Sequence, residues 1–140
     1  MKKSFKQIML IDDNEIDTFV STRLLNINEL SENIIETNSV EEALIYLNEE
    51  IKKGNPLSEL ILLDLNMDFQ DGYYFLEKFK SFSDSLKRDC KIIVLSSSQK
   101  EMDFSRIEAE PIVLKYFTKP LSKNAIQDLK ALLQNSPNYL

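Results

Sequence analysis

Short apolar runs alternate with longer amphipathic stretches along the chain. A run of four or five apolar residues is too short for a freestanding helix and is typical of a strand that is buried on both faces. Short segments of this kind predict five strands, at Gln7–Ile11, Asn33–Thr37, Leu60–Leu63, Lys91–Leu95 and Ile112–Phe117. Because helical stretches lie between these segments, the pattern predicts an α/β fold with right-handed crossovers and a parallel sheet that helices cover on both faces.

Helices are predicted from about Glu15 to Leu25 after the capping residues Asp12-Asp13-Asn14, from Val40 to before Gly54, from about Tyr73 to Lys80, and after Ser122. Ser39 with Glu42 three residues later matches a capping box. The apolar residues at helical spacing, which predict one apolar face on each helix, are Ile16, Phe19, Val20 and Leu24; Val40, Leu44, Leu47 and Ile51; Phe75, Leu76 and Phe79; and Ile126, Leu129, Leu132 and Leu133. A helix between Gln99 and Glu110 is a weaker prediction, because that stretch has few apolar positions and Pro111 prevents its continuation.

The length of 140 residues is in the commonest range for a single domain. We expect residues 1–140 to form one domain with a core from about residue 6 to residue 133 and a frayed tail, 134–140, that contains Pro137. The formal net charge of −6 and the scattered basic residues argue against a nucleic-acid-binding surface. No apolar run reaches membrane-spanning length and no signal-like segment follows Met1, so we expect a cytoplasmic protein with no membrane insertion.

Histidine is absent, and Cys90 is the single cysteine. These two facts exclude an internal disulfide, a zinc site built from His and Cys, and the nucleophile pairs that use histidine as the base. We expect Cys90 to pack at the start of the fourth strand, without a redox role.

Carboxylates follow two of the predicted strands directly. Asp12 and Asp13 follow the first strand, and Asp64 ends the third. The carboxyl ends of parallel strands lie at one edge of a sheet, which is where such folds bind their ligands. Three like charges in a small volume repel one another, so the arrangement suggests a hard cation such as Mg²⁺.

The strand ends carry, in chain order, Asp12-Asp13, Asp64, Ser96 and Lys119. This set resembles the receiver domain of two-component response regulators, and the resemblance extends from about Lys6 to Leu133. It implies a flavodoxin-like, doubly wound fold with strand order 2-1-3-4-5 and five flanking helices. It also implies that the chain is a phosphorelay component similar to stand-alone receivers encoded near bacterial sensor kinases, and that it is not an enzyme with turnover.

The resemblance assigns a role to each of these positions. Asp64 matches the phosphoacceptor, which takes a phosphoryl group from a phosphohistidine of a sensor histidine kinase or a histidine phosphotransfer protein. Asp12, Asp13 and Asp64 match the Mg²⁺ ligands, and Asn66 matches the residue whose backbone carbonyl completes the metal shell. Lys119, expected before a cis bond to Pro120, matches the cation that pairs with the phosphoryl oxygens.

Two further residues match the switch of the family. Ser96 matches the hydroxyl that hydrogen-bonds the phosphoryl group, with Ser97 as the alternative because the spacing to Lys119 is slightly long. Tyr116 matches the aromatic residue that turns inward as the hydroxyl moves, which remodels a surface for an unknown downstream protein. An aromatic on a final strand is also often simply part of the core, although the switch role is favoured here.

The sequence departs from the family pattern at two places. Met67-Asp68 stands where the family usually has Met-Pro, and Glu110-Pro111 replaces a small residue before the fifth strand. The first departure slightly favours one of two alternative functions, the pseudo-receiver. A pseudo-receiver would bind partners without phosphorylation. A haloacid-dehalogenase-like phosphatase would need an acid two residues after Asp64, where this chain has Asn66, which cannot titrate.

Overall fold

The computed structural model describes residues 3–65, 69–96 and 110–135. Five parallel strands form one sheet with the order β2-β1-β3-β4-β5, as predicted. The strands are β1 (Ile8–Ile11), β2 (Ile34–Thr37), β3 (Leu60–Asp64), β4 (Lys91–Ser96) and β5 (Val113–Thr118). Their bounds agree with the predicted ones to within one residue at each end.

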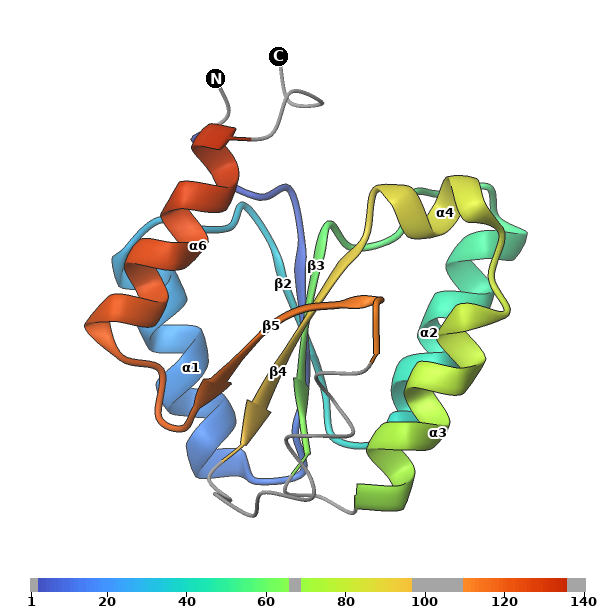
Figure 1. The fold of residues 1–140 in the computed structure, drawn as a ribbon, viewed down its shortest axis with the longest axis horizontal. Coiled ribbons are helices and arrows are strands. Elements are labelled where there is room, and N and C mark those ends of the chain that lie inside the picture. Colours follow the sequence, from blue (N-terminus) through green and yellow to red (C-terminus); the bar gives the residue numbers. More distant parts are fainter. Residues whose placement is uncertain (1–2, 66–68, 97–109, 136–140) are drawn as a thin grey trace.

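Helices cover both faces of the sheet. They are α1 (Glu15–Ile27), α2 (Val40–Lys52), α3 (Phe69–Lys80), the short α4 (Asp84–Arg88) and α6 (Lys123–Asn135). In Figure 1, α1 and α6 lie on one side of the sheet and α2 and α3 on the other, so the sheet is doubly wound. No helix in the described part of the chain is long and apolar enough to cross a bilayer.

Several helix predictions needed correction. Helix α3 begins four residues before Tyr73, and α4 was not predicted, because five residues are too few to show an apolar period. Helix α6 continues through Asn135, so residues 134 and 135 of the predicted tail are helical. The weaker prediction between Gln99 and Glu110 lies outside the described residues except for Glu110, which is in no helix.

The predicted capping residues cap their helices. Asn14 precedes α1, and its side chain accepts a hydrogen bond from the Asp17 amide at 3.0 Å. The hydroxyl of Ser39 accepts a hydrogen bond from the Glu42 amide, and that of Ser122 accepts one from the Ala125 amide, each at 3.0 Å. Each bond satisfies an amide in the first turn that has no partner within the helix.

The three central strands are buried on both faces, and alternate residues enter two different clusters. In β3, Ile61 and Leu63 pack with residues of α2 and α3, whereas Leu60 and Leu62 pack with residues of α1 and α6. All five residues of β3 are buried, including its last residue, Asp64. This explains why the strand appears in the sequence as an unbroken apolar run rather than as an alternating one.

The predicted apolar face of α1 was wrong for Ile16, Phe19 and Val20, which are exposed, whereas Leu24 does pack against the core. Ser21 and Leu25 are the buried residues of this helix, whereas Ile16 is 74% and Phe19 is 64% exposed. The N-terminal half of α1 therefore presents large apolar side chains to solvent beside the carboxyl edge of the sheet.

Strand β5 forms one edge of the sheet and none of its six residues is buried. Its register with β4 shifts between Ile92 and Ile93, which leaves Leu114 without a partner in the ladder and 43% exposed. Glu110, before this strand, forms an ion pair of 2.6 Å with Lys80 at the end of α3. The unusual Glu110-Pro111 sequence thus provides a link between α3 and the approach to β5.

Candidate functional site

The strand register brings the predicted site residues to the carboxyl edge of the sheet. Ile11, before Asp12, is level with Leu63, before Asp64. On the other side of β3, Asp64 is level with Leu95, and Ser96 ends β4 one residue later. Three segments that are distant in the sequence therefore end side by side, because parallel strands of similar length end at one edge.

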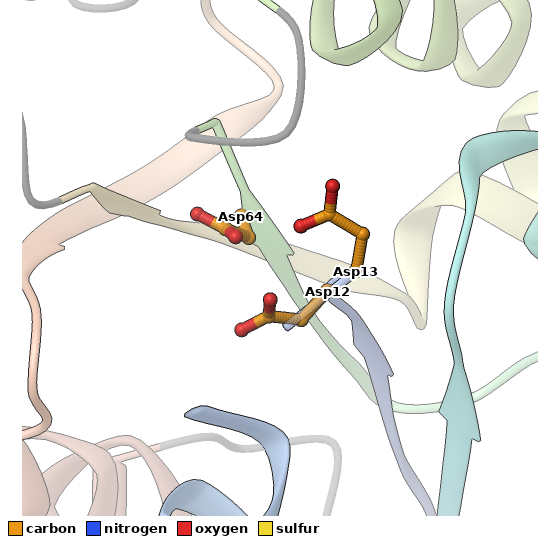
Figure 2. Close-up of side chains that lie close together, drawn as sticks. All are labelled: Asp12, Asp13 and Asp64. Atoms are coloured by element: carbon orange, nitrogen blue, oxygen red, sulfur yellow. The ribbon is translucent and has the colours of Figure 1, made fainter. Parts of the chain in front are cut away.

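Asp12, Asp13 and Asp64 converge at this edge. One carboxylate oxygen from each lies within 4.8 Å of the other two, and Figure 2 shows the three side chains grouped together. Asp64 and Asp12 are buried, at 1% and 6% exposed, whereas Asp13 is exposed. The site thus has two carboxylates fixed in the protein and a third at its rim.

The backbone holds Asp12 firmly. Its amide donates to the carbonyl of Thr37 at 3.1 Å, and its Oδ1 accepts from the Asn14 amide at 2.9 Å. Because the second bond forms the turn into α1, the same local structure that starts the helix orients this carboxylate.

Lys119 is the cation of the site. Its Nζ lies 2.9 Å from Oδ2 of Asp12, 2.9 Å from Oδ2 of Asp64 and 2.8 Å from Oδ2 of Asp17. Burial by itself would lower the pKa of this ammonium, but hydrogen bonds to the three carboxylates outweigh burial and raise that pKa above its ordinary value. Lys119 is therefore charged at neutral pH.

The backbone at Lys119 is also fixed. Its amide donates to the carbonyl of Ser96 at 2.9 Å, and its bond to Pro120 is cis, as predicted. The hydrogen bond from the Lys119 amide to Ser96 connects the end of β4 to the residue that follows β5, so Ser96 and Lys119 are adjacent at the edge.

The donor set suits a hard divalent cation. The carboxylates of Asp12, Asp13 and Asp64 are oxygen ligands of the kind that Mg²⁺ takes in proteins, usually few in number and completed by water. Their three negative charges exceed the single positive charge of Lys119. These three residues would hold the ion, whereas Asn66, predicted to add a backbone carbonyl, lies outside the described residues.

The two residues matched to the switch lie near this site. Ser96 is 6% exposed at the end of β4. Tyr116, level with Val94 across the β4 and β5 pair, is half-buried and packs against the cluster on the α2 and α3 side. Ser97, the alternative hydroxyl, lies outside the described residues.

Sequence reasoning missed Asp17. An acid in the first turn of a helix is usually explained by the helix dipole, and nothing in the linear sequence connects position 17 to position 119. The ion pair of 2.8 Å between the two side chains depends on the packing of α1 beside the end of β5.

Comparison with known proteins identifies the family. The family model for the response regulator receiver domain matches residues 8–131. The response regulator Rcp1 of Synechocystis sp. (strain ATCC 27184 / PCC 6803 / Kazusa) is 30% identical over 135 residues, which cover 96% of this chain and 88% of Rcp1.

Solved structures agree with this match. A two component response regulator from Cytophaga hutchinsonii has a TM-score of 0.83 and 29% identity, covering 95% of this chain and 99% of that one. The Mn²⁺-bound form of Rcp1 has a TM-score of 0.72 and 26% identity, covering 94% of this chain and 96% of that one. The phosphorylated cyanobacterial phytochrome response regulator RcpA has a TM-score of 0.71 and 30% identity, covering 92% of this chain and 91% of that one. The chain therefore belongs to the receiver domain family of bacterial two-component response regulators.

Proposed function

We propose that this receiver accepts a phosphoryl group from a phosphohistidine onto Asp64, with Mg²⁺, and thereby switches a protein-binding surface. The observation that carries the proposal is the position of the Asp64 carboxylate. It is buried, 2.9 Å from the Lys119 ammonium, and grouped with two further carboxylates. A carboxylate so placed is oriented for attack, and it has positive charge available to balance the phosphoryl group.

The reaction is a transfer in which a carboxylate oxygen of Asp64 attacks the phosphorus of the phosphohistidine. The new bond joins oxygen to phosphorus, the bond from phosphorus to the imidazole nitrogen breaks, and that nitrogen leaves with the electron pair. The product is an acyl phosphate on Asp64. Mg²⁺, when held by Asp12, Asp13 and Asp64, supplies positive charge that offsets the negative charge of the phosphoryl oxygens.

Lys119 and Ser96 would bind the phosphoryl oxygens of the acyl phosphate on Asp64. Lys119 already contacts Asp64, so its ammonium can pair with a phosphoryl oxygen attached there. Ser96 ends the neighbouring strand, and the hydroxyl of Ser96 would donate to another phosphoryl oxygen. Phosphorylation thereby gives the Ser96 hydroxyl a phosphoryl acceptor that the unmodified protein lacks, and such a difference is the condition for a switch.

The switch would reach the surface through Tyr116. This ring is half-buried on the least buried strand of the sheet, so a change in its position changes the exposed surface near β5. The partner that recognises this surface is a downstream protein.

The phosphodonor would be a sensor histidine kinase or a histidine phosphotransfer protein in the cytoplasm. A donor must cover the carboxyl edge of the sheet, because its histidine has to reach Asp64. A shallow pocket of about 360 Å³ at that edge is lined by Asp12, Asp13 and the exposed ring of Phe19, among other residues. The exposed apolar residues of α1 therefore lie where a bound donor would cover them.

The relatives support the metal and the modification. Rcp1 has been solved with Mn²⁺ bound, and RcpA has been solved in a phosphorylated form. The pseudo-receiver alternative is not favoured, because the acids and the lysine of the site are complete and in contact. The chain would act as a phosphoacceptor without turnover, since Asn66 offers no acid or base where a phosphatase of the alternative class needs one.

The test is intact-protein mass spectrometry after incubation with acetyl phosphate, with and without Mg²⁺. The wild type should gain one phosphoryl group only when Mg²⁺ is present, and Asp64→Asn should gain none. Asp84→Asn is the matched control, since the Asp84 side chain is 97% exposed on α4, and it should behave as the wild type. Absence of an adduct in the wild type, while a known receiver is modified in the same mixture, would count against the proposal and favour the pseudo-receiver.

A further inference from the structure

The ammonium of Lys119 uses all of its donors. It carries three protons, and three carboxylates lie within 2.9 Å: Asp12, Asp17 and Asp64. Asp12 and Asp64 belong to the group of carboxylates that can hold a metal, but Asp17 does not. Asp17 is thus a partner of the lysine with no other evident role at the site.

The position of Asp17 is fixed by the start of α1. Its amide donates to the side chain of the N-cap residue Asn14 at 3.0 Å, which fixes its backbone in the first turn of the helix. A negative charge in the first turn also interacts favourably with the helix dipole. The Asp17 side chain is 43% exposed, so placing it beside Lys119 costs little desolvation.

Lys119 needs such an anchor because its strand provides little. None of the residues of β5 is buried, and the Lys119 side chain itself is only 8% exposed. The position of the ammonium therefore depends on its carboxylate partners and on the bond from the Lys119 amide to Ser96, rather than on the packing of β5.

Under the proposed function, on which this inference rests, two of the three partners change when the receiver is activated. The Asp64 carboxylate becomes an acyl phosphate, and Asp12 becomes a ligand of the metal. The Asp17 carboxylate takes part in neither change. We propose that Asp17 is a positioning residue, which anchors the Lys119 ammonium while its other partners change and so presents it to the incoming phosphoryl group.

The first measurement concerns the lysine alone and requires no phosphorylation. In protein labelled with ¹⁵N-lysine, an ammonium held by three carboxylates exchanges its protons with water slowly, and Lys119→Met identifies its signal. Asp17→Ala should accelerate this exchange by about tenfold or more, the size expected for the loss of one hydrogen bond between charged groups. Asp17→Asn keeps an acceptor oxygen and should remain within about threefold of the wild type.

The second measurement is the rate of phosphoryl uptake from acetyl phosphate at saturating Mg²⁺. Asp17→Ala should lower this rate by about tenfold, with partial recovery in Asp17→Asn. Glu15→Gln is the matched control, because it removes one negative charge from the same turn of α1. In the Lys119→Met background, Asp17→Ala should have no further effect, since the two residues act through one interaction.

Each result decides a separate point. If Asp17→Ala leaves the proton exchange of Lys119 unchanged, Asp17 does not anchor the lysine. The same conclusion follows if Asp17→Ala lowers the uptake rate equally in the wild type and in the Lys119→Met background. Faster exchange with an unchanged uptake rate would overturn the positioning role. If the wild type takes up no phosphoryl group, the proposed function fails, while the exchange rates still decide whether Asp17 holds Lys119.

Discussion

The strands that carry Asp64 and Lys119 to the site differ sharply in their surroundings. Strand β3 lies at the centre of the sheet with all five residues buried, whereas β5 lies at the edge with none of its six residues buried. Asp64 is therefore positioned by strand packing, and Lys119 by its ion pairs and by the bond from its amide to Ser96. The nucleophile of the proposed reaction sits on the fully buried strand, and the residues that respond to it sit on or beside the least buried strand.

The largest expected effect comes from truncating a leucine in each strand. Leu62 is 1% exposed in β3 and Leu114 is 43% exposed in β5. Leu62→Ala leaves a cavity between the sheet and the α1 and α6 layer, and should lower the free energy of unfolding by about 3 kcal/mol. Leu114→Ala should lower it by about 0.5 kcal/mol. Urea unfolding followed by far-UV circular dichroism measures both, and equal losses would remove the basis of the comparison.

Removing the cation of the site should have the next largest effect. In Lys119→Met, the buried carboxylates of Asp12 and Asp64 lose their counter-charge, so the free energy of unfolding in EDTA should fall by about 2 kcal/mol. Added Mg²⁺ should restore part of this loss, since it neutralises the same carboxylates. Lys115→Met, on the same strand, removes an exposed lysine whose ion pair with Asp128 spans 3.8 Å, and should change stability by less than about 0.5 kcal/mol. A similar loss in both variants would show that ion pairs at the site do not position Lys119.

The pH dependence of stability tests how well the start of β4 is buried. Cys90 is 3% exposed, and burial raises the pKa of its thiol from 9.0 to about 12. The unfolded chain therefore loses the thiol proton first as the pH rises. Below pH 9.0 the thiol does not reduce the free energy of unfolding. Above pH 9.0 the free energy of unfolding decreases by about 1.4 kcal/mol per pH unit, until the pH reaches the pKa of the thiol in the folded protein.

Urea unfolding of the wild type and Cys90→Ala above pH 9.0 measures that contribution, which the variant should lack. Ellman's reagent should react with the thiol only after unfolding. Rapid reaction of the folded protein would mean that the amino end of β4 opens readily.

The smallest effect is expected from Ile16, on the exposed side of α1, and Leu25 on the buried side of the same helix provides the contrast. Ile16 is 74% exposed and Leu25 is fully buried. Ile16→Ser should change the free energy of unfolding by less than about 0.5 kcal/mol, whereas Leu25→Ser should lower it by about 3 kcal/mol. Thermal unfolding of the two variants checks this, and a large loss in Ile16→Ser would indicate that the outer face of α1 packs against another part of the protein.

The sequence alone determined the fold and most of the site. Strands buried on both faces appear as continuous apolar runs, and capping residues such as Ser39 act through bonds to amides three positions away, so both features are local and visible in the linear order. The convergence of Asp12 and Asp64 also followed, because parallel strands bring their carboxyl ends to one edge.

Only the tertiary structure decided which side chains meet across elements. The periodicity of α1 indicated an apolar face that included Ile16 and Phe19, but the rotation of the helix against the sheet buried Ser21 and Leu25 instead. The ion pair between Asp17 and Lys119 joins residues 102 positions apart, and no local pattern encodes a contact of that separation. Local propensity and periodicity determine elements and their order, whereas the rotation of a helix and the partners of a buried charge depend on packing that involves the whole chain at once.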